Sequence, residues 1–435
     1  MAQSHQSRSG TGPARRFLQA ELLRSATSTA MDFLNGIAEK YPQAISFAAG
    51  RPPGAFLGAN QTPAFLQAGI QAAAQRGPSG ALLSLEQAWI RFGQYADTDG
   101  IIVDDLRQLL IRMEGLEDDD LDLQITNGIQ EALLIECLAA AALGGAVLSF
   151  DPTYAGLTGA AATAGLPLYA MPRGPDPAGI IAATIRQARL ETAGPLLLYL
   201  IPDHDNPTGI SLTLPERQEI VALAASHGVT ILEDTAYRLF NYDQDRPASL
   251  FALAGPASPV VYLFSFSKAF MPGIRIGFSA RRKTATRTAA HRAALTNIKS
   301  YISVTTSPIA QAVITGFLQD CAYDLDQANR AKVQHCRANR DALAAGLRAA
   351  LPPGLAAFNT PGGGFFMTLE TGLPCDQAFM ERAARDYGVL FTPMAFFSPI
   401  GQGANQIRLS FSAGSLADMT TGAARLADFL ASEKI

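Results

Sequence analysis

Short apolar runs alternate with segments of helical periodicity through the middle of this 435-residue chain. The apolar runs cover residues 196–201, 229–232 and 260–264, with a further run at 275–279, and residues 217–226 between two of them have a helical pattern. Continuous apolar runs of this length are typical of strands that are buried on both faces of a sheet. Since helices separate the runs, the pattern predicts a mainly parallel sheet with helices on both faces.

The pattern changes in the last third of the chain. Residues 308–351 are helical with no internal proline, which predicts either one long connecting helix or two helices. Residues 364–369 and 407–411 read as strands and 416–432 as a closing helix. We therefore expect a large domain over 75–305, a smaller domain built from 41–74 and 306–435, and an N-terminal tail and arm over 1–40.

Two segments could be mistaken for targeting or membrane signals. The apolar stretch at 132–150 contains Glu136 and a Gly144-Gly145 break, so it predicts a helix, a turn and a buried strand rather than a membrane span. The first sixteen residues, through Arg16, are rich in Ser, Gly and Arg and contain no acidic residue, and no apolar segment of a secretory signal follows them. They predict a disordered tail.

Charge and composition exclude several classes of function. Lys plus Arg is 34 and Asp plus Glu is 38, and this net charge of −4 argues against nucleic-acid binding by bulk electrostatics. The four cysteines form no CxxC pair and the five histidines form no HxxxH set, so we expect neither a disulfide framework nor a metal site. A reducing, cytoplasmic location fits this cysteine usage. Only 17% of residues are charged, which hints at a surface partly buried in an oligomer.

A candidate nucleophile follows the run at 260–264, in the sequence Ser265-Phe266-Ser267-Lys268. A lysine at the end of a strand can form a Schiff base when its amine is partly neutral. Ser265, Ser267 and Arg275 would supply hydroxyl and guanidinium donors to a phosphate. Taken by itself, the segment could equally be a surface loop with an ordinary lysine.

Two more polar groups follow apolar runs. Asp234 comes after the run at 229–232, and a buried carboxylate there needs a cation such as a protonated pyridine nitrogen, although a helix N-cap is the alternative. Tyr237, three residues on, could donate to a phenolate oxygen. Asn206, in Asn-Pro-Thr-Gly beyond the run at 196–201, would point its amide into the crevice at the carboxyl ends of the strands, or simply form a turn.

Three further features are compatible with an anionic, planar ligand. Gly128-Ile129-Gln130 opens a helix whose N–H groups favour a phosphate, or it is a plain glycine turn. Tyr154 could stack on a planar ring or serve as a packing residue. Arg408 lies within an apolar strand and needs an anion, which a substrate carboxylate or a structural salt bridge would provide.

Together these elements describe one ligand with a pyridine ring, a phosphate, a phenolic oxygen and an aldehyde, which is pyridoxal phosphate. The chain resembles the class I and II aminotransferases of the fold-type-I pyridoxal-phosphate enzymes from about residue 45 to its C-terminus. The motifs most specific to the family are Ser-Phe-Ser-Lys with Pro272-Gly273-Ile274-Arg275, together with Asn-Pro-Thr-Gly. The likeness is strongest to the α-aminoadipate and kynurenine aminotransferase branch, on residues 45–50, Gln94-Tyr95 with Gly100, and Pro202 with Asn-Pro-Thr-Gly. It implies an α/β, aspartate aminotransferase-like fold, with a large mainly parallel sheet domain and a smaller α+β domain.

The resemblance also implies a role for each site residue. Lys268 would hold the Schiff base and later move the proton between Cα and C4′, while Asp234 would keep the ring nitrogen protonated. Asn206 and Tyr237 would bond the ring oxygen, and Tyr154 would stack on the ring. The phosphate would be held by Gly128, Ile129, Gln130, Ser265, Ser267 and Arg275, with Tyr95 reaching it from the neighbouring subunit of a homodimer. Substrate would be bound by Arg408, which clamps the α-carboxylate, and by Asn206 and Gly50.

Three positions depart from the family's usual residues. Ile129 stands where relatives usually have Ser, and Met394 stands where they usually have Gly, which would narrow the pocket. Arg51 follows Gly50 where an apolar residue is usual. We hypothesise that Arg51 reads a distal carboxylate or another anionic group of the substrate, the alternative being a surface or structural arginine.

The resemblance implies an enzyme that moves an amino group from an L-amino acid to a 2-oxo acid, with no metal, nucleic-acid or membrane partner. One alternative keeps the cofactor and changes the carbanion reaction to oxidation, elimination or replacement, cyclisation, or decarboxylation. Another is a pyridoxal-phosphate-sensing transcription regulator. Such regulators carry a DNA-binding module ahead of this domain, and the roughly forty residues before Ile45 are too few for one.

Overall fold

The computed structural model describes residues 13–24, 36–75, 81–117, 120–243, 245–255, 259–283 and 289–434. An eight-stranded sheet of order β1-β5-β4-β6-β7-β8-β9-β3 forms its centre. The strands of this sheet are β1 (Arg15–Phe17), β3 (Leu121–Thr126), β4 (Ala146–Asp151), β5 (Leu168–Pro172), β6 (Leu196–Leu200), β7 (Val229–Asp234), β8 (Val260–Ser265) and β9 (Gly277–Arg282). The pairs from β5 through β8 are parallel, while β1, β9 and β3 each pair antiparallel with a neighbour, so the sheet is mainly parallel as predicted.

Helices cover both faces of this sheet. One group, whose members contact one another, contains α6 (Ile129–Ala142), α7 (Ala155–Ala164) and α12 (Ala289–Ile302), and the other contains α8 (Pro177–Glu191), α9 (Leu214–His227) and α10 (Leu250–Leu253). Strands β4 and β8 each contact a member of both groups, and all six residues of each strand are buried. This two-sided burial explains why these strands are continuous apolar runs.

A second, antiparallel sheet lies beside the C-terminal helices, in the order β10-β11-β14-β13, and a short parallel pair joins β12 to β2. These strands are β2 (Ile45–Ser46), β10 (Ala357–Phe358), β11 (Phe366–Glu370), β12 (Val389–Leu390), β13 (Thr392–Pro393) and β14 (Gln406–Ser410). The remaining helices are α1 (Gln19–Arg24), α3 (Thr62–Gln75), α4 (Leu85–Gly93), α5 (Val103–Glu114), α11 (Phe266–Ala269), α13 (Pro308–Asp320), α14 (Leu325–Ala350), α15 (Gln377–Asp386) and α16 (Leu416–Glu433), with short 3₁₀ turns η1 (Gly54–Phe56), η2 (Ala59–Gln61), η4 (Pro272–Ile274) and η5 (Met394–Phe397).

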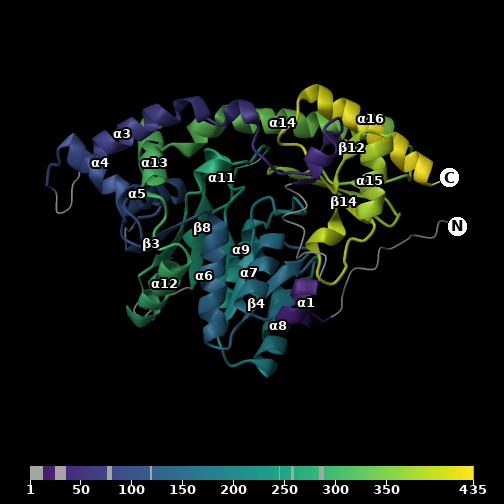
Figure 1. Ribbon diagram of the computed structural model, residues 1–435. Helices are drawn as coiled ribbons and strands as arrows, with labels where there is room; N and C mark the ends of the chain where they lie inside the picture. The colour runs from purple at the N-terminus through teal and green to yellow at the C-terminus, as the bar shows by residue number, and fades with distance from the viewer. Residues whose placement is uncertain are drawn as a thin grey trace.

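The helical region predicted over 308–351 consists of two helices. Helix α13 ends at Asp320, and α14 begins at Leu325 and runs along the top of the molecule to α16 (Figure 1). Ala322 and Tyr323, between them, both have positive φ angles, of 49° and 59°. A left-handed backbone cannot continue an α-helix, so the chain turns there.

Two expectations from the sequence need correction. The tail expected to be disordered through Arg16 is ordered at its end, because β1 pairs antiparallel with β5 and places Arg15 opposite Ala170 and Phe17 opposite Leu168. Residues 1–12 of that tail lie outside the described residues. The strand expected at 275–279 begins only at Gly277, because Arg275 occupies a left-handed turn at φ 51°.

The predicted domain boundaries remain a prediction, although β1 belongs to the large sheet and not to a separate arm. Within the described parts of the chain, no helix is long and apolar enough to span a membrane.

Candidate active site

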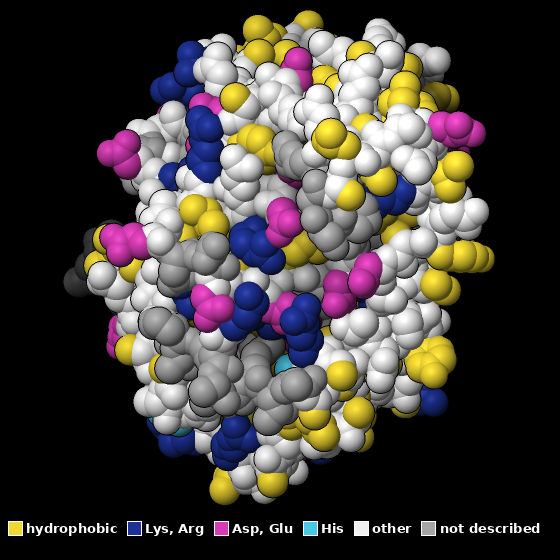
Figure 2. Space-filling model, turned by 90° about the vertical axis from the view of Figure 1, so that its left-hand side faces the viewer, with side chains coloured by type: hydrophobic (Ala, Val, Ile, Leu, Met, Phe, Trp, Pro, Cys, Tyr) yellow, Lys and Arg dark blue, Asp and Glu magenta, His cyan; other side chains and the backbone are white. Residues whose placement is uncertain are grey.

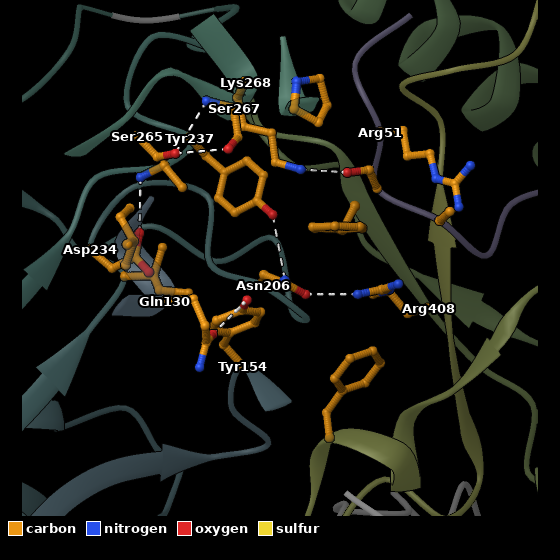
Figure 3. A pocket seen from close by; sticks show the side chains of 18 of the residues that line it. Arg51, Gln130, Tyr154, Asn206, Asp234, Tyr237, Ser265, Ser267, Lys268 and Arg408 are labelled. Carbon is orange, nitrogen blue, oxygen red and sulfur yellow. Dashed lines mark hydrogen bonds between the residues drawn. The ribbon is translucent and has the colours of Figure 1, made fainter. Parts of the chain in front are cut away.

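A cavity of about 360 Å³ lies where the carboxyl ends of β6, β7 and β8 face β14 of the small sheet (Figure 3). This volume is in the usual range for small-molecule sites, and its position is the usual one for open α/β sheets. Of the fifteen residues that the sequence predicts for the site, all line the cavity except Gly128 and Tyr95. Among the described residues, no group of His, Cys, Asp and Glu could hold a metal ion.

One end of the cavity is a cluster of hydroxyl and guanidinium donors. The Oγ of Ser265 donates to the Oγ of Ser267 at 2.9 Å, and Arg275 Nη1 donates to the same Ser267 oxygen at 2.9 Å. Arg275 Nη2 reaches across to the carbonyl of Asn127 at 2.8 Å. Gly128, with φ 74°, stands against this guanidinium, and a Cβ there would lie only 2.6 Å from Arg275 Nη2. Glycine is therefore what lets the arginine approach the loop.

The same end receives the N-terminus of α6. No side chain caps this helix at Gly128, so the first-turn N–H groups of Ile129 and Gln130 remain available to an anion. Glu131 holds the preceding loop, since its carboxylate accepts from the backbone N–H of Asn127 at 2.6 Å. The side chain of Gln130 accepts from the hydroxyl of Tyr154 at 3.2 Å.

Asp234 ends β7 with its carboxylate facing the cavity. It is 3% exposed and accepts from the hydroxyl of Tyr199 at 2.8 Å and from the backbone N–H of Ala236 at 3.0 Å. Burial raises the pKa of this carboxyl to about 6, against the two hydrogen bonds, which lower it. The carboxylate is thus a desolvated anion without a salt-bridge partner among the described residues, and a buried cation would stabilise it.

Lys268 lies on the four-residue helix α11, directly after β8. Its Nζ donates to the carbonyl of Gly50 at 2.7 Å (Figure 3). Desolvation of the amine, followed by the positive charges of Arg408 and Arg275, lowers the pKa of Lys268 to about 8. A primary amine with this pKa is partly neutral near physiological pH and can attack a carbonyl carbon.

Asn206 connects the two sides of the cavity. Its Oδ1 accepts from Arg408 Nη1 at 2.8 Å, which directs its Nδ2 towards the hydroxyl of Tyr237 at 3.5 Å (Figure 3). Tyr237 packs edge-on against the ring of Phe366, and burial raises the pKa of its phenol well above the usual value. The hydroxyl is therefore protonated at any physiological pH and can donate a hydrogen bond.

Arg408 is a buried cation without an acidic partner among the described residues. Its guanidinium lies between two rings, 4.2 Å from the centroid of Phe366 and 4.4 Å from that of Phe397. Nη2 donates to the carbonyl of Ala48 at 2.6 Å, and Nε has no hydrogen-bond partner. Burial lowers the pKa of this guanidinium to about 9. The geometry of a buried guanidinium suits the two oxygens of a carboxylate.

Three other predicted positions lie apart from this centre. Arg51 lines the mouth of the cavity with an exposed side chain, and its backbone carbonyl accepts from Ser412 Oγ at 2.6 Å. Met394 does not line the cavity; it is fully buried in a small cluster behind Phe397. Tyr95 is 84% exposed after α4 and is not part of this chain's own cavity.

The sequence reasoning missed Tyr199, Phe366 and Phe397. Tyr199 lies inside the apolar run at 196–201, where its hydroxyl was the one polar group and could have signalled a buried partner. Phe366 and Phe397 resemble core residues, and nothing in their spacing distinguishes them from core. Their contact with Arg408 becomes visible only when β11, β14 and η5 are brought together.

The arrangement fits pyridoxal phosphate on the chemistry of its donors. An uncapped helix terminus, two serines and an arginine suit a phosphate, and the glycine cradle at Gly128 would be filled by any larger residue. The desolvated carboxylate of Asp234 suits a protonated ring nitrogen. The side-chain amide of Asn206 and the hydroxyl of Tyr237 lie 3.5 Å apart, so both could donate to one ring oxygen.

The comparisons with known proteins agree with this fit. The family model for aminotransferase class I and II matches residues 53–426. The (S)-3,5-dihydroxyphenylglycine transaminase of Amycolatopsis orientalis is 34% identical over 405 residues, covering 92% of this chain and 90% of that protein. The 2-aminoadipate transaminase of Thermus thermophilus is 29% identical, over 77% of this chain and 80% of its own. The crystal structure of an α-aminoadipate aminotransferase from Thermus thermophilus, complexed with N-(5′-phosphopyridoxyl)-L-leucine, superposes with a TM-score of 0.73 at 25% identity, covering 95% and 96% of the two chains. The chain therefore belongs to the class I and II aminotransferases, the pyridoxal-phosphate-dependent enzymes that move an amino group from an amino acid to a 2-oxo acid.

Proposed function

We propose that Arg408 binds the α-carboxylate of the amino acid and that Lys268 is the catalytic amine, in an aminotransferase whose donor carries an aromatic side chain. The observation that carries this proposal is the buried Arg408, which has no acidic partner among the described residues and faces the same cavity as Lys268. A buried unpaired cation is costly, and a ligand carboxylate relieves that cost. Binding there would turn the Cα of the substrate towards the lysine amine.

Each residue of the site has a defined task in this scheme. When bound, pyridoxal phosphate supplies an electron sink that stabilises negative charge at the substrate Cα. Asp234, held by Tyr199, keeps a proton on the ring nitrogen. Lys268 removes the proton from Cα and returns it on the cofactor side. This proton transfer requires a neutral amine, which the lowered pKa of about 8 provides.

The phosphate group would be held by Ser265, Ser267, Arg275 and the N-terminus of α6. Ile129 offers only its backbone N–H there, and the hydroxyl usual at that position is absent. Tyr154 would cover one face of the ring from its position after β4. Tyr237 and Asn206 would donate to the phenolic oxygen and so favour its anionic form.

The aromatic preference rests on the rings beside Arg408. Phe366 and Phe397 both line the cavity, so a substrate held at Arg408 places its side chain near aromatic faces. Aromatic pairs in offset or edge-on contact are worth about 0.5–1.5 kcal/mol beyond area burial. The name of the Amycolatopsis relative, a transaminase of a dihydroxyphenyl amino acid, supports the same class of donor.

We infer that Arg51 binds the distal carboxylate of the 2-oxo acid, the second substrate of the reaction. The cavity wall carries four cations, Arg51, Lys268, Arg275 and Arg408, against the single carboxylate of Asp234. The cofactor phosphate would pair with Arg275 and the α-carboxylate with Arg408, and the distal carboxylate of a dicarboxylic 2-oxo acid would be attracted by the positive charge of Arg51 in the same cavity wall. Arg51→Ala should raise KM for dicarboxylic oxo acids and leave KM for monocarboxylic ones unchanged. An unchanged ranking of the two classes would remove the assignment.

We also propose that the enzyme is a homodimer. The side of the molecule that bears α4 and α12 has hydrophobic side chains at its surface (Figure 2). Thr305 Oγ1 donates to the carbonyl of Asp97 at 3.2 Å, which brings the end of α12 beside the loop of Tyr95. The exposed apolar residues of these two segments are Leu85, Trp89, Ile90, Tyr95, Tyr301, Ile302 and Val304. Large apolar side chains exposed on neighbouring segments are typical of an oligomer interface, and such an interface would carry Tyr95 towards a partner's phosphate site.

The test is the visible absorption spectrum of the loaded enzyme while single L-amino acids are added without an oxo acid. One stoichiometric loss of the visible band, restored by a 2-oxo acid, is expected, with aromatic donors reacting fastest. Repeated turnover in the absence of any oxo acid would instead identify another reaction of the same cofactor. Lys268→Ala should abolish both the wild-type spectrum and turnover, and retained turnover would refute the role of Lys268.

A further inference from the structure

A buried lysine on helix α14 contacts the backbone of the proposed catalytic segment. Lys332 is 3% exposed, and its Nζ donates to the carbonyls of Lys268 at 2.9 Å and Ala269 at 3.0 Å. Both carbonyls belong to the end of the four-residue helix α11, whose last C=O groups have no continuing turn to receive them. Lys332 has no acidic partner among the described residues, so these two carbonyls hold its ammonium group.

The same face of α14 contacts the segment that follows the strand of Arg408. Seven residues beyond Lys332, the side-chain Nδ2 of Asn339 donates to the carbonyls of Phe411 at 2.9 Å and Gly414 at 2.7 Å. Seven residues are two helical turns, so the two side chains share a face and lie about 10 Å apart along the axis. Cys336, between them, is also buried against this segment, beside the carbonyl of Ser412.

We propose that helix α14 fixes the position of the lysine segment relative to the arginine strand, and that Lys332 and Asn339 are the positioning residues at its two contact points. The inference rests on the proposed roles of Lys268 and Arg408. Neither Lys332 nor Asn339 lines the cavity, so both act through the backbone that they hold.

This geometry matters because Lys268, which would deprotonate the substrate, lies on the segment held by Lys332, and Arg408, which would bind it, lies on the strand before the segment held by Asn339. A misplacement of about 1 Å in a reacting group can lower a rate by about 100-fold. The amine of Lys332 also brings positive charge to Lys268, because it contacts the backbone carbonyl of that residue and, with a pKa that burial lowers to about 8, is mostly protonated at pH 7. The charged groups that face the Lys268 amine directly are Arg408, Arg275, Asp234 and Arg51. The titratable group beside Lys332 is the thiol of Cys336, which stays neutral because burial raises its pKa to about 12.

The first experiment replaces Lys332 in the enzyme with pyridoxal phosphate bound. It compares kcat, KM and the pH midpoint of the visible absorption band of the cofactor. Lys332→Met should lower kcat by about 10- to 100-fold with little change in KM. It should also raise the pH midpoint of the band, because removing the Lys332 charge from the Lys268 carbonyl favours the protonated form of the Lys268 nitrogen. Lys332→Gln keeps a donor but no charge, so it should recover part of kcat while the midpoint stays raised. It also serves as the test variant if Lys332→Met does not fold.

Asn329→Leu is the matched control. Asn329 lies on the same helix and is buried, and its Nδ2 bonds only within α14, to the carbonyl of Leu325 at 2.9 Å. This variant should keep wild-type kcat and pH midpoint. Asn339→Leu should instead raise KM for the amino acid, because it releases the segment after Arg408.

Two results would overturn the inference. The first is wild-type kcat and pH midpoint in both Lys332 variants, and the second is an equal loss of kcat in Asn329→Leu. Failure of the proposed function has a different signature, since Lys268→Ala would then retain turnover whatever the Lys332 variants do.

Discussion

Replacing Arg408 tests whether its guanidinium is the carboxylate-binding group. In Arg408→Met the side chain keeps its apolar stem and loses the donors that now reach Asn206 at 2.8 Å and the Ala48 carbonyl at 2.6 Å. Loss of one partner from a buried, hydrogen-bonded charge pair costs about 2–5 kcal/mol. At about 1.4 kcal/mol per tenfold, kcat/KM for an L-amino acid should fall by about 30- to 5,000-fold.

The lysine variant separates charge from geometry. Arg408→Lys keeps a positive charge but loses the planar fork and the stacking between Phe366 and Phe397. A desolvated contact between a cation and an aromatic ring contributes about 2 kcal/mol. The lysine variant should therefore fall between wild type and Arg408→Met.

The assay compares an aromatic L-amino acid with the amine that lacks only its carboxyl group, following the visible band in a single half-reaction. Wild type should react much faster with the amino acid than with the amine. In Arg408→Met this difference should largely disappear, because the amine has no carboxylate for the guanidinium to bind. Arg51→Met is the control, since it removes a cation at the cavity mouth and should leave this preference intact. If Arg408→Met keeps the wild-type preference for the acid, the carboxylate is bound elsewhere and the reasoning is wrong.

Three further predictions follow from burial. In the cofactor-free enzyme, the amine of Lys268 should react with acylating reagents with a midpoint near pH 8. At pH 7 about one tenth of this amine is neutral, a fraction roughly 300-fold larger than for an ordinary lysine. A midpoint near pH 10.5 would contradict the structure. Burial raises the pKa of Asp151 to about 7, although a hydrogen bond from Ser398 opposes this shift. The folded state therefore keeps a proton on Asp151 that the unfolded state loses above about pH 4. Because of this difference, the free energy of unfolding should fall as pH rises from about 4 to 7. Asp151→Asn should flatten part of that fall in urea titrations at several pH values, and an unchanged slope would show that Asp151 is not the group. Gly50→Ala should raise KM by about tenfold or more, because a Cβ there would overlap the ring of Phe366 and displace it from Arg408; an unchanged KM would show that the ring has room to move.

The sheet could be predicted from the sequence because each central strand is buried on both faces. Two-sided burial leaves a continuous apolar run, and the runs at 196–201, 229–232 and 260–264 coincide with β6, β7 and β8. Strand β1 could not be predicted in this way, since its three residues are Arg-Arg-Phe and only Phe17 is buried at this edge of the sheet. The break between α13 and α14 was also hidden, because residues that rarely adopt positive φ, Ala322 and Tyr323, occupy the turn.

Cavity-lining residues were predictable where a polar residue lies within a few positions after an apolar run. Asp234 and Lys268 both satisfy that rule, and the parallel sheet brings the strand ends together. Residues that only pack could not be found, since a Phe beside a guanidinium and a Phe in the core have the same local sequence. The positioning face of α14 belongs to this second kind, because Lys332 is one more polar position in a helix until the fold shows that it is buried.

The distribution of charge in the cavity explains why the protein tolerates buried cations there. Burial lowers the pKa values of Lys268 and Arg408, which shows that the folded chain holds these charges at a cost. In the proposed scheme, the phosphate of the cofactor and the carboxylate of the substrate would relieve that cost when they bind. We therefore expect ligands to supply part of the stability of this fold, since a ligand that binds only the folded state at 100 times its Kd adds about 2.7 kcal/mol. Replacing Arg408 by an apolar residue of similar volume should then stabilise the empty protein and, at the same time, weaken its preference for anionic substrates.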